Sequence, residues 1–260
     1  NAGHGLPFDS EGMKERYPDI FFSQFTGAEL VADKWNLSRE DLDQFALESH
    51  QKAAQATESK YFDKEILPVE GKNAEGINDL VMADEGIRFD ASLDKLAGLN
   101  PVTEGGKITA GNASQITDGA AAVLICNDAG LKKIKSIPRA EIVSISVVGD
   151  DPVFMLTGPI PASHKALDIA KLSIEDMDIY EVNEAFAPVP LAWAEELKAD
   201  RSKLNVNGGA MALGHPLGAT GAKLMTTMLH ELERRKAKYA LQAICEGGGT
   251  ANATIIKRVS

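Results

Sequence analysis

The chain has 260 residues and a mass of 27.8 kDa, with 44% hydrophobic and 25% charged residues. This composition excludes a disordered or fibrous protein, and the length is enough to bury one or two cores without disulfides. Its 27 basic and 38 acidic residues leave a formal net charge of −11, which argues against a nucleic acid or an anionic membrane as the main partner.

The two cysteines, Cys126 and Cys245, are too few for a disulfide framework, and their spacing fits no metal site. We therefore expect no bound metal and a reducing, cytoplasmic setting. No apolar run reaches the roughly 18 residues that a membrane span needs, so we expect no membrane span. The first residues, Asn1–Gly5, contain no initiator Met and no targeting pattern. We expect a piece of a longer or processed protein, which leaves organellar targeting open.

The first part of the chain predicts helices and an irregular excursion rather than a sheet. Residues 1–24 are rich in Gly, Pro and Asp and predict a surface loop with a short helix. Ser38, with Asp41 three residues later, forms a capping-box pattern, so we expect a long helix to begin there. Residues 64–107 alternate short apolar runs with turn residues and predict an irregular segment over a neighbouring core. The apolar residues of the long helix recur at helical spacing, which predicts one buried face: Leu42, Phe45, Ala46, Ala53 and Ala54.

From Thr109 the sequence predicts alternating strands and helices. The small polar segment 109–114 leads to the apolar run 120–126, which we expect to be a fully buried strand with Cys126 in the core. This alternation predicts a layered α/β domain over 139–260. The runs 120–126 and 251–256 both follow small-residue loops, which hints at two related halves. The other expected elements are strands at 141–148, 179–182, 239–245 and 251–258, helices at 162–172, from 188 and at 219–235, and a glycine-rich loop at 205–218.

His215 and Cys245 are the first candidate functional residues. His215 lies in a glycine-rich run, between Gly214 and Pro216, where a backbone can approach a ligand beside a restrained imidazole. By itself a lone histidine in such a loop is more often a surface residue, and the run lacks the dinucleotide-binding fingerprint. Cys245 ends a predicted strand before Gly247–Gly249, where free backbone N–H groups can lower the pKa of a thiol and bind an anion. This position favours a functional cysteine over a structural one.

Asn183 and Glu184 stand where a predicted strand ends and a helix begins, a frequent position for site residues in α/β folds. Read alone, Asn183 can equally be a helix cap. The remaining histidines carry no predicted function: His50 and His230 are expected in helices, and His4 and His164 in loops.

Four segments stand out when they are read together in chain order: T-A-G-N-A-S at 109–114, N-E-A-F at 183–186, G-G-A-M-A-L-G-H-P-L-G-A-T-G at 208–221 and C-E-G-G-G at 245–249. In type and spacing they resemble the thiolase family, the acetyl-CoA acetyltransferases and 3-ketoacyl-CoA thiolases. The resemblance covers essentially the whole chain. It implies a layered α/β/α/β/α fold with part of an inserted loop domain: residues 1–107 as loop domain and connections, 108–136 as the end of the N-terminal half, and 137–260 as the C-terminal half.

The resemblance implies an acyl-CoA C-acyltransferase, which makes or cleaves 3-ketoacyl-CoA by reversible Claisen chemistry, with coenzyme A thioesters as substrates and no further cofactor. By the family pattern, His215 activates a nucleophilic cysteine and Cys245 moves the α-proton. Asn183 holds a water in the first oxyanion hole, and the Gly247 N–H contributes to the second. The positions that match the lining of the pantetheine arm of CoA are Ser114, Ala185 and Phe186.

The nucleophilic cysteine of the family lies upstream of the loop domain, and this chain begins after that point. Neither Cys126 nor Cys245 matches it, so we expect the chain alone to be inactive, with the missing N-terminal half of the same protein as its partner. The family also implies a homodimer or homotetramer. Segment Phe22–Phe25 stands where many short-chain members carry a His-Met pair, which predicts a different pocket and a bulkier acyl chain than acetoacetyl.

Two other functions stay open. A condensing enzyme of the ketoacyl-synthase type shares the fold but needs no second catalytic cysteine, so Cys245 argues against it. A non-catalytic CoA-binding subunit would have lost the nucleophile half, and the joint presence of His215, Cys245 and Asn183 argues against such a scaffold. The expected setting is fatty-acid or lipid metabolism, including β-oxidation.

Overall fold

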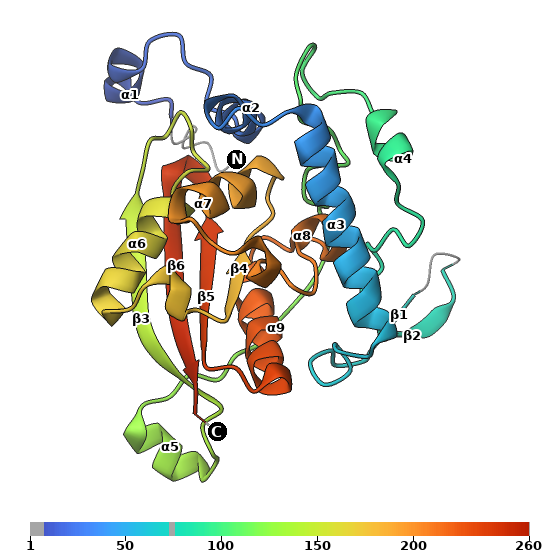
Figure 1. The fold of residues 1–260 in the computed structure, drawn as a ribbon, viewed down its shortest axis with the longest axis vertical. Helices are drawn as coiled ribbons and strands as arrows, with labels where there is room; N and C mark the ends of the chain where they lie inside the picture. The colour runs from blue at the N-terminus through green and yellow to red at the C-terminus, as the bar shows by residue number, and fades with distance from the viewer. Residues whose placement is uncertain (1–7, 73–75, 260) are drawn as a thin grey trace.

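The computed structural model describes residues 8–72 and 76–259. A four-stranded sheet lies at the centre with helices on both faces, and the long helix α3 runs beside this body (Figure 1). The helices are α1 Glu11–Arg16, α2 Gln24–Lys34, α3 Arg39–Glu58, α4 Leu93–Ala97, α5 Asp128–Ile134, α6 Pro159–Ala170, α7 Pro188–Leu197, α8 Ala210–Leu213 and α9 Thr220–Arg235. The strands are β1 Val69–Lys72, β2 Asn78–Val81, β3 Ala140–Gly149, β4 Ile179–Val182, β5 Tyr239–Cys245 and β6 Thr250–Arg258.

The central sheet has the strand order β3-β6-β5-β4, with β4 and β5 parallel and the other neighbours antiparallel. Because successive side chains of a strand face opposite sides, Ile179 and Tyr180 of β4 point into different layers. Tyr180 packs against Trp193 of α7, with ring centroids 5.3 Å apart. Ile179 belongs to a second buried cluster with Met228 of α9. Helices α6 and α7 therefore cover one face of the sheet, and α9 covers the other.

Helix α3 begins as its sequence predicts. The Ser38 hydroxyl accepts a hydrogen bond from the Asp41 N–H, and the Asp41 carboxylate accepts one from the Ser38 N–H, which completes the predicted capping box. Four of the five predicted apolar positions are buried, and only Ala54 is half-buried. The buried face packs against the short helix α8, so α3 reaches the glycine-rich segment of the second part of the chain.

Most elements after residue 139 agree with prediction. Strands 179–182 and 239–245 match to the residue, and the other strands and helices differ only at their ends. The predicted loop 205–218 contains the single-turn helix α8, and the predicted irregular segment 64–107 contains the β1–β2 hairpin and α4. The expectation that His164 lies in a loop is wrong. It lies in α6, within the helix that the sequence predicts at 162–172, and α6 begins at Pro159 because Pro159 and Pro161 are tolerated in a first helical turn.

The prediction that residues 120–126 form a fully buried strand is wrong, and so is the core position of Cys126. The run is extended but pairs with no strand of the described residues, and Leu124 and Ile125 are 78% and 68% exposed. Cys126 is exposed as well. An apolar strand becomes buried only when other strands flank it and helices cover it, and none of the described strands lies beside this one. His4 lies outside the described residues.

Candidate active site

Asn183 and Cys245 meet because β4 and β5 are parallel neighbours whose carboxyl ends lie at the same edge of the sheet. The Asn183 N–H donates to the Ala243 carbonyl at 3.0 Å, which fixes Asn183 directly after β4. Its side chain is 1% exposed, and neither polar atom completes a hydrogen bond within the described residues. The amide nevertheless lies close enough to the Cys245 thiol to act on its pKa. A buried amide without a partner costs free energy, so it is poised to bind a group from outside the chain.

The prediction that the glycine turn lowers the pKa of Cys245 is wrong in its net direction. Burial raises the pKa of the Cys245 thiol to about 12, and its own backbone and the nearby Asn183 amide offset only part of this increase. The negative charge of Glu246 raises it further. Desolvation outweighs the local N–H groups because the thiolate would sit in an apolar layer. The thiol is therefore protonated at neutral pH.

Residues Gly247–Gly249 form the turn that leads from the end of β5, near Cys245, to β6. Gly248 and Gly249 have φ values of +75° and +81°, a backbone region that favours glycine. A side chain on Gly249 would also approach the Asp150 carbonyl oxygen to 2.9 Å. Gly247 is exposed, and the space beside it is open. The turn thus presents its backbone next to Asn183 and Cys245, at an accessible edge of the sheet.

His215 is held as a neutral imidazole. The Thr220 hydroxyl donates to the Pro216 carbonyl at 3.0 Å, so its oxygen must accept the 2.6 Å hydrogen bond from His215 Nδ1. This assigns the proton of the neutral ring to Nδ1 and leaves Nε2 unprotonated. Burial, with a smaller contribution from the positive charge of Lys223, lowers the pKa of His215 below its ordinary value of 6.5. Half-buried His215 is accordingly uncharged at pH 7.

Short backbone contacts join the remaining predicted residues. The Ser114 N–H donates to the Ala185 carbonyl at 2.9 Å, and Ala113 forms a bridge with Phe186. The next residue, Gln115, accepts the His215 N–H through its carbonyl oxygen at 2.9 Å. Ser114, Ala185 and Phe186 therefore lie side by side, and the same segment positions His215. The structure brings these four residues into one region, as a shared site requires.

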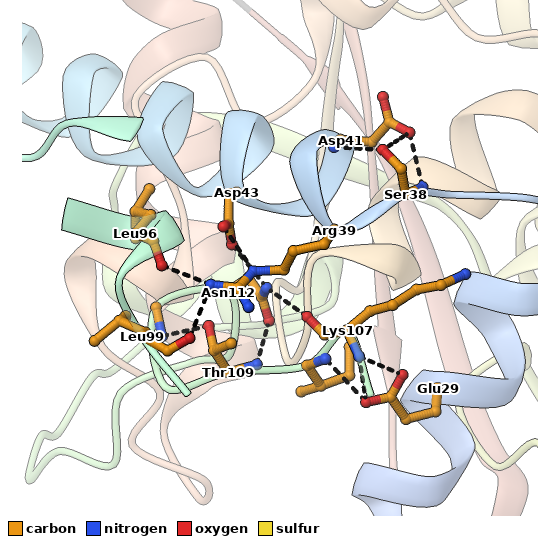
Figure 2. A network of polar contacts seen from close by, with 12 residues as sticks. Glu29, Ser38, Arg39, Asp41, Asp43, Leu96, Leu99, Lys107, Thr109 and Asn112 are labelled. Atoms are coloured by element: carbon orange, nitrogen blue, oxygen red, sulfur yellow. Dashed lines mark hydrogen bonds and ion pairs between the residues drawn. The ribbon is translucent and has the colours of Figure 1, made fainter. Parts of the chain in front are cut away.

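A polar network, shown in Figure 2, fixes the loop that carries Ser114. Asn112 donates to the Asp43 carboxylate at 2.9 Å and accepts from the Thr109 N–H at 2.8 Å. Arg39 holds the other oxygen of Asp43 at 2.6 Å. The Asn112 carbonyl in turn accepts the Ala187 N–H at 2.9 Å. Because Asp43 and Asn112 are both buried, this network connects α3 rigidly to the segment that carries Asn183.

Sequence reasoning missed the role of Glu184. This buried carboxylate accepts hydrogen bonds from the Ser49 hydroxyl at 2.6 Å, the Asn205 amide at 2.9 Å and the Met211 N–H at 3.2 Å. Gly209 lies against it, and its N–H donates to Ser49 at 3.1 Å. Glu184 therefore ties α3, the end of β4 and the glycine-rich segment together. The available signal was a glutamate that stands, with Glu181 and Asn183, inside the largely apolar run 179–194.

The described residues lack two further features. No group of three or more His, Cys, Asp or Glu side chains is placed to hold a metal ion. None of the helices there is both long and apolar enough to cross a membrane.

Comparison with known proteins supports the resemblance. The sequence matches the family model of the thiolase N-terminal domain over residues 10–129 and that of the thiolase C-terminal domain over 136–258. It is 54% identical over 251 residues to a steroid 3-ketoacyl-CoA thiolase of Mycobacterium tuberculosis, which covers 96% of this chain and 60% of that protein. It is 45% identical over 261 residues to a 3-ketoacyl-CoA thiolase of Yersinia enterocolitica, at 98% and 67% coverage.

The fold agrees as well. The crystal structure of human mitochondrial 3-ketoacyl-CoA thiolase matches with a TM-score of 0.87 and 45% identity, over 90% of this chain and 59% of that one. A Bacillus anthracis acetyl-CoA acetyltransferase matches with a TM-score of 0.88 and 40% identity, over 93% and 61%. The chain spans about three fifths of the length of most of these relatives. Its mixed α/β fold is thiolase-like, and the chain belongs to the thiolase family.

Proposed function

We propose that this chain supplies the base, the acid and the oxyanion-binding groups of a thiolase, which cleaves or forms 3-ketoacyl-CoA with coenzyme A. The observation that carries the proposal is the unpartnered, buried amide of Asn183 beside the protonated thiol of Cys245. Thiolysis breaks a C–C bond and leaves a carbanion equivalent on the α-carbon of acetyl-CoA. A protonated thiol at that point supplies the proton, and in the synthetic direction the resulting thiolate takes it back.

His215 acts as the base in this proposal. Its unprotonated Nε2 accepts the proton of a nucleophilic cysteine, or of the CoA thiol in the second half of the reaction, and returns it afterwards. Thr220 keeps Nε2 free by binding Nδ1. Asn183 binds a water that, with His215, stabilises the negative charge on the thioester oxygen, and the Gly247 N–H serves the second oxyanion. The groups proposed along the pantetheine arm are Ser114, Ala185 and Phe186.

The nucleophilic cysteine is proposed to lie outside this chain. We therefore expect no covalent acyl adduct when the purified chain is incubated with acetyl-CoA or acetoacetyl-CoA and its intact mass is measured. Cys245 stays protonated at the pH of such an experiment, and exposed Cys126 does not match the nucleophile position of the family pattern. A mass increase of one acetyl group that maps to Cys245 or Cys126 would overturn the proposed division of roles.

A positive test needs the nucleophile, so we define the joined enzyme as this chain fused to the upstream segment of the human mitochondrial 3-ketoacyl-CoA thiolase. Thiolysis by the joined enzyme would support the proposal, and its absence in a folded, CoA-binding fusion would favour the alternative of a non-catalytic CoA-binding subunit. A ketoacyl-synthase-like enzyme would instead require an acyl carrier and tolerate loss of Cys245. A dimer or a tetramer stays our prediction for the complete protein.

The acyl substrate is proposed to be bulkier than acetoacetyl. Phe25 packs edge-on against Phe186, with ring centroids 5.3 Å apart, and Phe8 stacks on Phe22 at 4.3 Å. Phe8 also lies next to Gly248 of the glycine turn. Apolar rings at this place favour an extended apolar acyl group, and one relative is described as acting on a steroid 3-ketoacyl-CoA.

Truncation of one of these phenylalanine side chains tests the acyl preference. We expect Phe25→Ala in the joined enzyme to lower kcat/KM for a long-chain 3-ketoacyl-CoA about tenfold relative to acetoacetyl-CoA, because apolar contacts with the chain are lost. Phe89→Ala, an exposed phenylalanine remote in sequence from the site, is the control. An equal effect of Phe25→Ala on both substrates would contradict this assignment.

A further inference from the structure

A buried polar pair crosses the sheet on the face that α9 covers. Glu181 of β4 and Gln242 of β5 are direct neighbours in the parallel ladder, and their side chains are on the same face. They are 1% and 3% exposed. Each has an oxygen, Oε1, with no hydrogen-bond donor among the described residues. None of the proposed catalytic steps uses either residue.

The two Oε1 atoms belong to side chains of adjacent strands. Both are hydrogen-bond acceptors, so neither supplies the donor that the other lacks. The orientation of the Gln242 amide is fixed because its Nε2 donates to the Gly221 carbonyl at 3.1 Å. Its Oε1 therefore remains an acceptor that needs a donor. A carboxylate cannot donate, but a protonated carboxyl group carries one O–H donor. A proton on Glu181 would satisfy both residues at once.

The charges around Glu181 favour the neutral form. Burial is the main cause that raises the pKa of Glu181 well above 4.5, and the carboxylates Glu184, Glu231 and Glu65 raise it further. Lys52 of α3 opposes them but lies hydrogen-bonded to the Leu204 carbonyl.

Glu181 lines a small cavity, and Lys223 of α9 is the only cation among the described residues that line it. That ammonium is already engaged by the Leu213 carbonyl and pairs with Asp84 at 3.4 Å. No cation is therefore left to neutralise an ionised Glu181 from inside the cavity.

The small cavity that Glu181 lines has a volume of about 10 Å³, the size that accepts one water molecule. Thr220, which orients His215, lines the same cavity. A negative charge there would act on His215 through a low-dielectric space and favour its protonated form. A neutral Glu181 leaves the base uncharged.

We propose that Glu181 is a protonated carboxylic acid in the folded chain at neutral pH, which donates a hydrogen bond to Gln242 Oε1, directly or through one water in the cavity, and so acts as a positioning residue that adds no charge behind His215. The protonation itself does not depend on the thiolase activity. Only its consequence for the base rests on the proposed function.

The first test is the pH dependence of stability. The unfolded chain loses this proton near its ordinary pKa of 4.5, whereas the folded chain keeps it, so stability declines as pH rises above that value until the folded group ionises. Glu181→Gln supplies a neutral donor of the same shape and needs no proton. We expect the folding constant of E181Q relative to the wild-type chain to rise by up to about tenfold per pH unit between about pH 5 and pH 8 in urea titrations. A ratio that stays constant over this range would overturn the proposal.

The second test follows His215 and needs no catalytic activity. We expect the His215 titration, followed by side-chain NMR of the full chain, to have the same midpoint in E181Q as in the wild-type chain, because a neutral group has been replaced by a neutral group. A lower midpoint in E181Q would show that Glu181 is charged and contradict the proposal.

The third measurement is infrared spectroscopy of the folded wild-type chain at pH 7, which gives a result even if E181Q does not fold. We expect a protonated-carboxyl stretch, and its absence would equally overturn the proposal. Where E181Q folds, loss of that band assigns it to Glu181. Glu184 is a second buried carboxyl group, whose pKa burial also raises although hydrogen bonds from Ser49, Asn205 and Met211 oppose this increase, so the band is assigned to Glu181 only where E181Q removes it.

Discussion

Replacing His215 by Ala in the joined enzyme is expected to lower kcat for thiolysis by about 10²–10⁴-fold, the range that a positioned general base contributes. The reason is geometric as well as chemical. Thr220 holds Nδ1 at 2.6 Å and leaves Nε2 as the free base, and partial burial lowers the pKa of His215 so that the ring is neutral at pH 7. Loss of thioester substrate and product analysis measure the rate directly.

Cys245→Ala in the joined enzyme is expected to lower kcat for thiolysis by a similar factor, because it removes the proposed proton donor beside the α-carbon. Alanine replacements of another histidine and another cysteine, both outside the proposed site, serve as controls. His164 lies exposed on α6, and Cys126 lies exposed in the 120–126 run, so alanine at either position should leave kcat within about twofold. Full activity in His215→Ala or Cys245→Ala, with these controls also active, would contradict the proposed roles.

Gly209→Ala is expected to cost about 3 kcal/mol of folding stability and to lower Tm by roughly 6–12 °C. The φ of Gly209 is −148°, which alanine adopts freely, so backbone strain contributes nothing. A Cβ at this position would lie 2.2 Å from the Glu184 carboxyl carbon. Glu184 cannot move aside without losing its hydrogen bonds from Ser49 and Asn205. Urea and thermal unfolding measure the effect.

A control and a rescue accompany the Gly209 variant. Gly218 belongs to the same glycine-rich segment, but no atom lies within 4 Å of its Cβ position, so Gly218→Ala should change stability by less than about 0.5 kcal/mol. Shortening the carboxylate in Gly209→Ala/Glu184→Asp should recover part of the loss, because the clash is with the end of that side chain. Equal stability of Gly209→Ala and Gly218→Ala would show that Glu184 is not a rigid anchor.

Elements set by local rules were predictable. Ser38 and Asp41 satisfy each other within one helical turn, and the apolar run of β5 has turn residues on both sides, so both elements could be located from the chain alone. The candidate residues were also located from local patterns, because Asn183 and Cys245 each end a predicted strand and His215 stands in a glycine-rich run. Their roles came from the family resemblance and remain proposals.

Properties that depend on distant parts of the chain were not predictable. Cys126 lies in an apolar run that reads as core, yet burial requires neighbouring strands that the described residues do not place there. The thiol of Cys245 is next to glycine N–H groups, but the layer of side chains around it decides its pKa. Glu184 is recognised as an anchor only when Ser49 and Asn205, far away in sequence, are seen to bind it.

The Glu184 anchor also bears on the order in which the chain folds. Its bond to Ser49 closes a span of 135 residues, and the bond from Gly209 to Ser49 closes one of 160. Loop-closure entropy must be overcome before such contacts become favourable, so non-local contacts form late and slowly. α3 and the β5–β6 hairpin can form early, because their contacts are local. The glycine-rich segment that carries His215 should reach its final conformation only in the last cooperative step, when α3 docks against it.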